Sequence, residues 1–111
     1  VLGWVLSVSV AFADLGLAPM HPDPATTPGH LCTTSDRDFK EYRYGEQIAY
    51  CERNVETQLK AKIYAQYRIP ESERRNYTID HFIPLSIGGS NSEANLWPEH
   101  KRIKESRMNL E

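Results

Sequence analysis

The sequence predicts a small α+β domain: a helical N-terminal part with a disulfide, followed by a strand–loop–strand–helix unit. Apolar residues recur at every fourth position over one segment, which is typical of a single stripe on an amphipathic helix. These residues are Val55, Leu59, Ile63 and Tyr67. Residues 77–83 are β-rich, a loop with two adjacent glycines follows, and residues 95–97 can form a second short strand. Residues 99–110 then supply helix formers.

The composition is that of one ordinary globular domain. The 111 residues are 40% hydrophobic and 25% charged, and 13 basic against 15 acidic residues leave a formal net charge of −2. This balance excludes a strongly basic, histone-like nucleic-acid binder, because such proteins neutralise many phosphates. It does not exclude a nuclease, whose contact surface can be local.

The N-terminal segment indicates export. Residues 1–13 carry no charge and end in Ala11-Phe12-Ala13, a small-x-small pattern. We interpret them as the apolar core and cleavage site of a secretory signal peptide without its basic front, so the mature protein is expected to start at Asp14. A transmembrane helix needs about 17–25 apolar residues, and Asp14 interrupts this run earlier. A buried N-terminal strand or helix is the alternative.

Residues 14–35 are expected to form an extended arm. Four of the seven prolines lie between Ala18 and Gly29, and this density blocks helix formation and sheet pairing. The pattern of residues 36–50 is mixed, and we interpret it as irregular surface leading into a short helix through Ile48.

The two cysteines, Cys32 and Cys51, are expected to form a disulfide, because an even count is typical of small exported domains. There are two alternatives to the disulfide. A zinc site with His30 as a further ligand lacks the C-x-x-C spacing of such sites. A catalytic cysteine is the other alternative, and nothing near Cys51 marks it as a nucleophile.

The ends of the helices follow from capping residues and prolines. Asn54 is expected to cap the amphipathic helix, and Ile69-Pro70 to end it. Pro84 ends the first strand of the last unit, and Pro98 suits the first turn of the final helix, Glu99–Leu110.

The last unit gathers residues that can carry chemistry. Asp80 and His81 are adjacent at the end of its first strand, Asn95 follows fourteen residues after His81, and His100 is expected in the first turn of the helix. A carboxylate and two imidazoles near a helix N-terminus can hold a divalent metal and a phosphate together. Phosphodiester hydrolysis needs a deprotonated water and a cation on the leaving oxygen, and an imidazole can serve as the base.

The order of these residues resembles the HNH endonuclease motif. The run DHFIPLSIGGSN at 80–91 followed by NLWPEH at 95–100 carries the resemblance, which extends from Tyr77 to about Leu110, roughly a third of the chain. The upstream segment with the two cysteines is also similar to exported members of that family. The resemblance implies a ββα-metal unit at 77–110 inside a nuclease domain at 36–111.

The resemblance also implies a role for each matching residue. His81 is the general base that activates water, and Asp80 is a metal ligand. Asn95 braces the loop by hydrogen bonds and so aims His81, and His100 completes the metal site. The implied cofactor is one divalent metal ion, Mg²⁺ first, although an imidazole ligand also admits Mn²⁺, Ni²⁺ or Zn²⁺.

Alternatives remain at this site. Neighbours on a regular strand face opposite ways, so Asp80 and His81 converge only if the strand end is twisted or bulged. Glu99 or Lys104 could take the place of His100, although a protonated lysine cannot be a ligand. The basic residues of the last helix are either phosphate contacts or a solvated face. They are Lys101, Arg102, Lys104 and Arg107.

The expected function is therefore that of a secreted or periplasmic, metal-dependent endonuclease that cuts DNA, or both DNA and RNA. We expect a monomer whose partner is its nucleic-acid substrate, with no membrane contact in the mature form; no inhibitor protein is identified. The alternative is a non-catalytic exported binding module built on a ββα structural metal fold.

Overall fold

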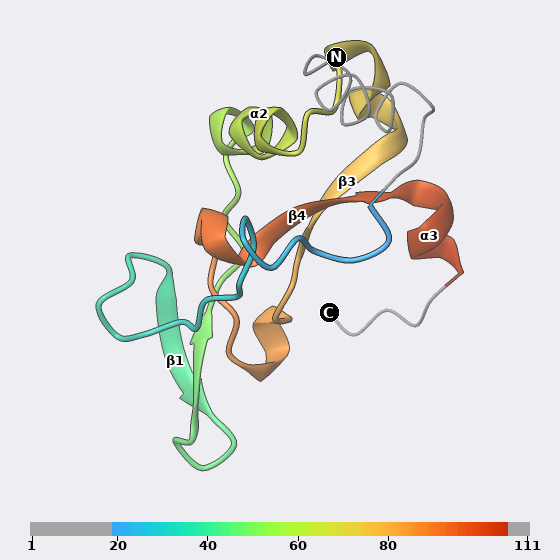
Figure 1. Ribbon diagram of the computed structural model, residues 1–111. Helices are drawn as coiled ribbons and strands as arrows, with labels where there is room; N and C mark the ends of the chain where they lie inside the picture. The colour runs from blue at the N-terminus through green and yellow to red at the C-terminus, as the bar shows by residue number, and fades with distance from the viewer. Residues whose placement is uncertain (1–18, 107–111) are drawn as a thin grey trace.

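The computed structural model describes residues 19–106. Its main elements are two antiparallel hairpins with helices beside them (Figure 1). The expected signal segment 1–13 and Arg107 lie outside the described residues. The elements are β1 (Phe39–Arg43), β2 (Ile48–Cys51), α2 (Thr57–Gln66), β3 (Tyr77–His81), β4 (Leu96–His100) and α3 (Lys101–Glu105). Short 3₁₀ turns lie at Glu71–Asn76, Leu85–Ile87 and Glu93–Asn95. The α+β class is thus confirmed.

The N-terminal part is a β-hairpin, so the expected short helix through Ile48 is wrong. β1 pairs with β2, and the register is irregular between Phe39 and Glu41. The turn holds residues with left-handed backbone, Gly45 at φ 66° and Tyr44 at φ 57°; only the glycine does so without strain. Aromatic side chains favour a strand over a helix in this segment.

The predicted disulfide between Cys32 and Cys51 is confirmed, and it lies in the smaller of two apolar clusters. Both cysteines are buried and pack with Leu85 of the loop between β3 and β4. The disulfide therefore fixes the first hairpin against the loop of the second. His30 lies elsewhere, with its Nδ1 2.7 Å from Ser90 Oγ.

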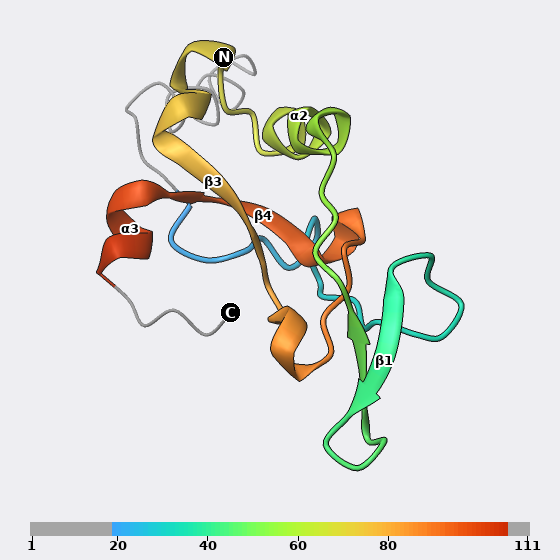
Figure 2. The ribbon, with the colours of Figure 1, turned by 180° about the vertical axis from the view of Figure 1, so that it is seen from behind.

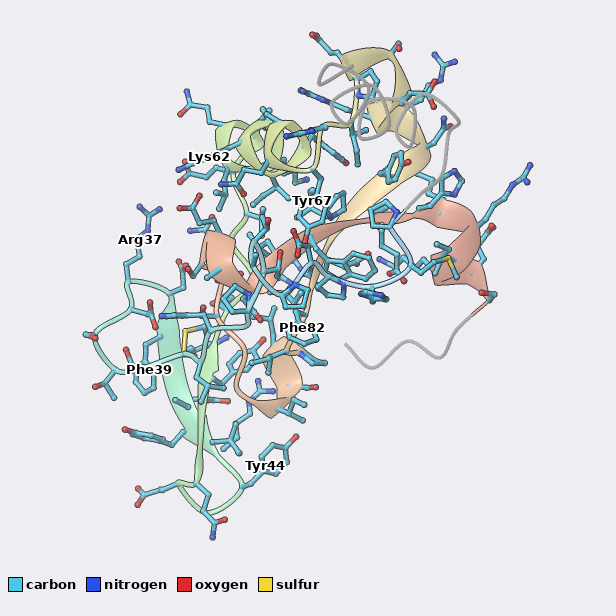
Figure 3. The ribbon with its side chains drawn as sticks, viewed as in Figure 1. Arg37, Phe39, Tyr44, Lys62, Tyr67 and Phe82 are labelled. Carbon is cyan, nitrogen blue, oxygen red and sulfur yellow. A yellow bond between two sulfur atoms is a disulfide. The ribbon has the colours of Figure 1, made fainter. Side chains whose placement is uncertain are left out.

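The described part of the proline-rich arm turns at Asp23–Thr27, where the Thr26 and Thr27 N–H groups bond to the Asp23 carbonyl, and it crosses β4 in contact with it (Figure 1). Thr27 is fully buried and donates its hydroxyl to the Leu96 carbonyl at 3.0 Å. The Thr27 and Tyr67 hydroxyls are 2.6 Å apart; Tyr67, labelled in Figure 3, reaches the arm from the end of α2. Gly29 N–H bonds to the Ala94 carbonyl at 2.8 Å. The arm thus belongs to the packed structure.

The amphipathic stripe predicted for the first helix is confirmed by α2. Ile63 is fully buried and packs with Ile79 of β3 and Leu96 of β4. Burial of side chains of this size contributes about 1.5–3 kcal/mol each. Asn54 does not cap the helix, because its side chain binds Asp38 instead. No helix among residues 19–106 is long and apolar enough to cross a membrane.

The second hairpin is regular throughout. Five consecutive pairs join β3 to β4, from Tyr77 opposite His100 to His81 opposite Leu96. Pro98 lies in β4 opposite Ile79, and α3 begins only at Lys101, so the predicted helix start at Glu99 is wrong. A proline is tolerated here because each strand of a two-stranded sheet has an open edge that needs no donor.

The ladder assigns its side chains to two faces, because directly opposed residues share a face. Ile79 and Leu96 share the face that packs against α2. Asp80 lies on the other face and binds Lys104 of α3. The two helices accordingly lie apart, on either side of the β3–β4 ribbon (Figures 1 and 2).

Removing the disulfide should destabilise the chain. In Cys32→Ala/Cys51→Ala, we expect the free energy of unfolding to fall by about 3 kcal/mol, the chain-entropy value for a loop of this length. Urea unfolding of the oxidised native chain and the variant measures the difference. An unchanged midpoint and slope would show that the disulfide does not hold the hairpin in place.

Candidate active site at the second hairpin

The loop between β3 and β4 is closed by the side chain of Asn95, which is fully buried. Its Oδ1 accepts the Ile83 N–H at 2.9 Å, and its Nδ2 donates to the carbonyls of Ile83 at 3.0 Å and Ser90 at 2.8 Å. The Asn95 carbonyl also accepts the Phe82 N–H at 2.8 Å. The Asn95 side chain therefore joins Ile83 to Ser90 and closes the loop segment 83–90 that follows His81.

Gly89 makes this closure sterically possible. A Cβ at this position would overlap the Ile83 carbonyl and approach Asn95 Nδ2 to 2.9 Å. Gly88 adds the backbone turn, with φ 102°, a conformation that residues with a side chain rarely adopt. The glycine pair is thus required by the close approach as well as by the turn.

His81 lies at the end of β3 and is only 6% exposed. Its Nε2 is 2.9 Å from the Oδ1 of Asn91. Asn91 is buried as well, with 8% of its surface exposed. Asn91 in turn donates from Nδ2 to Asp38 Oδ2 at 3.0 Å and to the Glu52 carbonyl at 2.7 Å. Asn91 is the last residue of the run that resembles the HNH motif, but the resemblance was given no role for Asn91, and Asp38 was expected only on irregular surface. No local sequence signal links these two residues, which are 53 positions apart.

Asp80 lies on the other face and has two partners. Its Oδ1 forms an ion pair with Lys104 Nζ at 2.8 Å, and its Oδ2 accepts the Thr78 hydroxyl at 2.8 Å. The carboxylate is almost fully buried, whereas the lysine is about one-third exposed. Lys104, one of the two alternatives at the metal position, is thus the residue of α3 that meets Asp80.

His100 is not brought to Asp80. It is the residue that precedes α3, where its Nδ1 accepts the Arg102 N–H at 3.1 Å. Its ring packs edge-on against Tyr77 with centroids 5.1 Å apart, on the face opposite to Asp80. Burial raises the pKa of Tyr77, so its hydroxyl stays protonated at neutral pH.

The strand remains regular where convergence of Asp80 and His81 would need a bulge. The β3–β4 register shows no shift, so the two neighbouring side chains project to opposite faces. Glu99, the other alternative ligand, pairs with Thr78 and therefore shares the face of Asp80, and it is almost fully buried. The two faces thus carry different chemistry: the imidazoles of His81 and His100 on one, and acidic groups with a lysine on the other.

The groups at Asp80 do not fit a divalent cation as they are arranged. The Lys104 ammonium already lies at hydrogen-bond distance from Oδ1, and His100 is on the other face. Among residues 19–106, the one group of three metal-ligating side chains within 4.8 Å is Cys32, Asp36 and Cys51. This cluster could hold a metal ion only with both sulfurs reduced, because metals bind thiolates and not disulfides.

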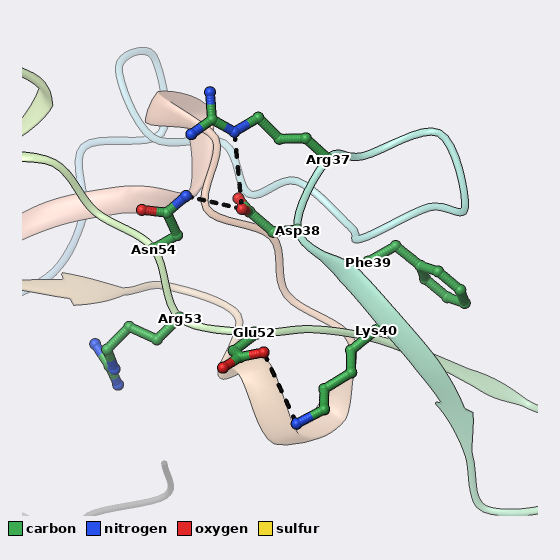
Figure 4. A pocket seen from close by; sticks show the side chains of 7 residues that line it. All are labelled: Arg37, Asp38, Phe39, Lys40, Glu52, Arg53 and Asn54. Carbon is green, nitrogen blue, oxygen red and sulfur yellow. Dashed lines mark hydrogen bonds and ion pairs between the residues drawn. The ribbon is translucent and has the colours of Figure 1, made fainter.

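Basic side chains lie on two surfaces near these groups. Lys101 and Arg102 are exposed at the start of α3. A second surface is an open pocket of about 500 Å³ beside the first hairpin (Figure 4). There Arg37 is paired with Asp38 at 3.9 Å, and the exposed Lys40 has a carboxylate partner at 3.8 Å. The wall of this pocket thus includes Asp38, which holds Asn91.

Comparisons with known proteins give no relative. A scan against protein-family models, a search of curated proteins and a search of solved structures each find no match for this chain.

The Asp80–Lys104 pair predicts a measurable coupling. Lys104→Met leaves the buried carboxylate without its cation, so we expect the free energy of unfolding to fall by about 1–3 kcal/mol. Adding Asp80→Asn removes the buried charge and should recover part of the loss. Urea unfolding of the two single variants and the double variant gives the coupling energy.

Lys101→Met, on the exposed side of the same helix, is the control, and its free energy of unfolding should stay within about 0.5 kcal/mol of the native value. Strict additivity of the two changes would contradict the pairing.

Proposed function

We propose that this chain hydrolyses phosphodiester bonds of nucleic acid, as an endonuclease of HNH type acting on DNA. The observation that carries the proposal is a buried imidazole at a strand end with its following loop closed by one asparagine. His81 and Asn95 occupy these positions, and they are the two residues to which the HNH resemblance assigns the base and the brace.

His81 is the group that removes a proton from the attacking water. The resulting hydroxide attacks phosphorus, the bond from phosphorus to the leaving oxygen breaks, and that oxygen leaves with a proton from solvent. Because the groups at Asp80 do not fit a cation as arranged, no step is assigned to a metal there. Lys101 and Arg102 are exposed at the start of α3 and are the proposed contacts to substrate phosphates. Lys104 is engaged with Asp80.

We propose that the chain acts outside the cytoplasm, secreted or periplasmic, as a monomer. The Cys32–Cys51 disulfide supports this location, because disulfides persist in oxidising compartments.

A second candidate is a non-catalytic binding module. Two observations favour it: the Lys104 ammonium neutralises the carboxylate that the resemblance assigns to a metal, and His81 is largely shielded from solvent. A protein that only binds nucleic acid would retain the fold without using either group.

A plasmid-nicking assay separates the two candidates. Mg²⁺ and Mn²⁺ are supplied because the resemblance implies a divalent cation, and the native chain is expected to convert supercoiled plasmid to open circles. His81→Ala should lower kcat by about 10²–10⁴-fold, the usual share of a general base. His21→Ala is the matched control, because His21 is exposed, and it should leave kcat unchanged. A native chain that binds plasmid but never nicks it would support the binding module instead.

A further inference from the structure

The amide of Asn91 can be oriented in one way only. Its Oδ1 accepts the backbone N–H of Asn54 at 3.2 Å. Its Nδ2 faces Asp38 Oδ2 and the Glu52 carbonyl, both of which can only accept a hydrogen bond from it. Reversing the amide would set an oxygen against two acceptors and an NH₂ group against a donor. The atom that faces His81 is therefore an acceptor.

We propose that Asn91 is the positioning residue for His81, an inference that rests on the proposed function. Since Asn91 Oδ1 lies 2.9 Å from His81 Nε2, Nε2 must carry a proton and donate it to Asn91. In the neutral ring the lone pair is then on Nδ1. Nδ1 is the nitrogen that takes the proton from water in the proposed reaction, and Asn91 fixes both the tautomer and the plane of the ring.

The same bond becomes stronger as the reaction proceeds. When Nδ1 accepts the proton, the ring becomes an imidazolium, and its Nε2–H becomes a charge-assisted donor to Asn91 Oδ1. The Asp38 carboxylate accepts from the other end of the same amide, which polarises Oδ1 and makes it a better acceptor. Asp38 and Asn91 thus stabilise the charged form of His81 without contacting the substrate.

The residues that hold Asn91 flank the first hairpin, outside the segment that resembles the HNH motif. Glu52 directly follows Cys51 of the disulfide, and its N–H bonds to the Asp38 carbonyl at 2.9 Å. Asn54 Nδ2 donates to the second carboxylate oxygen of Asp38 at 2.9 Å. The disulfide hairpin therefore has a part in positioning the base.

Nitrogen NMR of the imidazoles tests the tautomer directly, without an activity assay. In alkaline buffer, a long-range ¹H–¹⁵N spectrum of the native chain should show His81 protonated at Nε2, with an Hε2 signal that exchanges slowly with water. His21, which is exposed, is the internal reference and should show no such signal. His81 protonated at Nδ1, or without a protected Hε2, would overturn the proposal. This measurement decides the tautomer even if an Asn91 variant fails to fold.

Asn91→Ala and Asn54→Ala form the matched pair for the functional consequence. Each removes one side-chain amide that binds Asp38, but Asn54→Ala keeps the backbone N–H on Asn91 and leaves the bond to His81. Asn91→Ala should lose the protected Hε2 signal and lower kcat for plasmid nicking by about 10- to 100-fold, with KM little changed. Asn54→Ala should keep the protected Hε2 signal and lose less kcat than Asn91→Ala, because the Asn91–His81 bond remains.

Equal losses of kcat in the two variants would overturn the proposal, because the network would then have only a structural role. Retention of the Hε2 signal and of kcat in Asn91→Ala would overturn it as well. Failure of the proposed function is distinguishable: a native chain without nicking activity would refute the nuclease assignment, while the imidazole spectrum would still show whether Asn91 fixes the ring.

Discussion

The hydrogen bonds of the buried Asn95 amide are the constraint on which the second hairpin depends. They bind Ile83 at one end of the loop and Ser90 at the other, and Asn91 directly follows that second end. Each bond contributes about 1 kcal/mol net, but leaving a buried amide or carbonyl without a partner costs more. Only a glycine at position 89 allows the chain to approach Ile83 this closely, so the loop closes in this arrangement because of Gly89. That arrangement sets Asn91 beside His81.

The regular β3–β4 ladder has the opposite effect on Asp80 and His81, which it separates. A continuous register sends neighbouring side chains to different faces. Asp80 then meets Lys104 of α3, whereas His81 meets Asn91 and, through it, the first hairpin. The first and second hairpins are thereby joined by polar contacts as well as by the packing of Leu85 against the cysteines. The surroundings of His81 are therefore built from both hairpins.

Three features of the fold could be predicted from the sequence, because each depends on residues that are close together in the chain or on a simple residue count. The apolar stripe of α2, the disulfide and the loop with its glycine pair depend on periodicity, cysteine count and backbone freedom. The start of α3 was misplaced because Pro98 suits both a first helical turn and an open strand edge, and only pairing with Ile79 decides between them.

The rest depends on contacts between distant parts of the chain. In the first hairpin, Gly45 and the nearby aromatic residues favour strands joined by a turn, but the polar residues around them carry no regular alternation that would separate a strand from a helix. The partners of Asn91 come from a segment 37 to 53 positions earlier. His100 and Lys104 are close to each other in sequence but far from Asp80, and only the ladder register shows that His100 faces away from Asp80.

The β3–β4 hairpin keeps His81 and Asp80 apart, and Lys104 is the cation at Asp80. Line broadening by Mn²⁺ in the ¹H–¹⁵N spectrum of the oxidised chain tests this arrangement most directly, because a bound Mn²⁺ ion broadens the signals of nearby amides. In the native chain, amides flanking Asp80 and in α3 should stay sharp at stoichiometric Mn²⁺, and they should broaden in Lys104→Met, where Oδ1 is released. Broadening around Asp80 in the native chain, at the same Mn²⁺ concentration, would contradict the account.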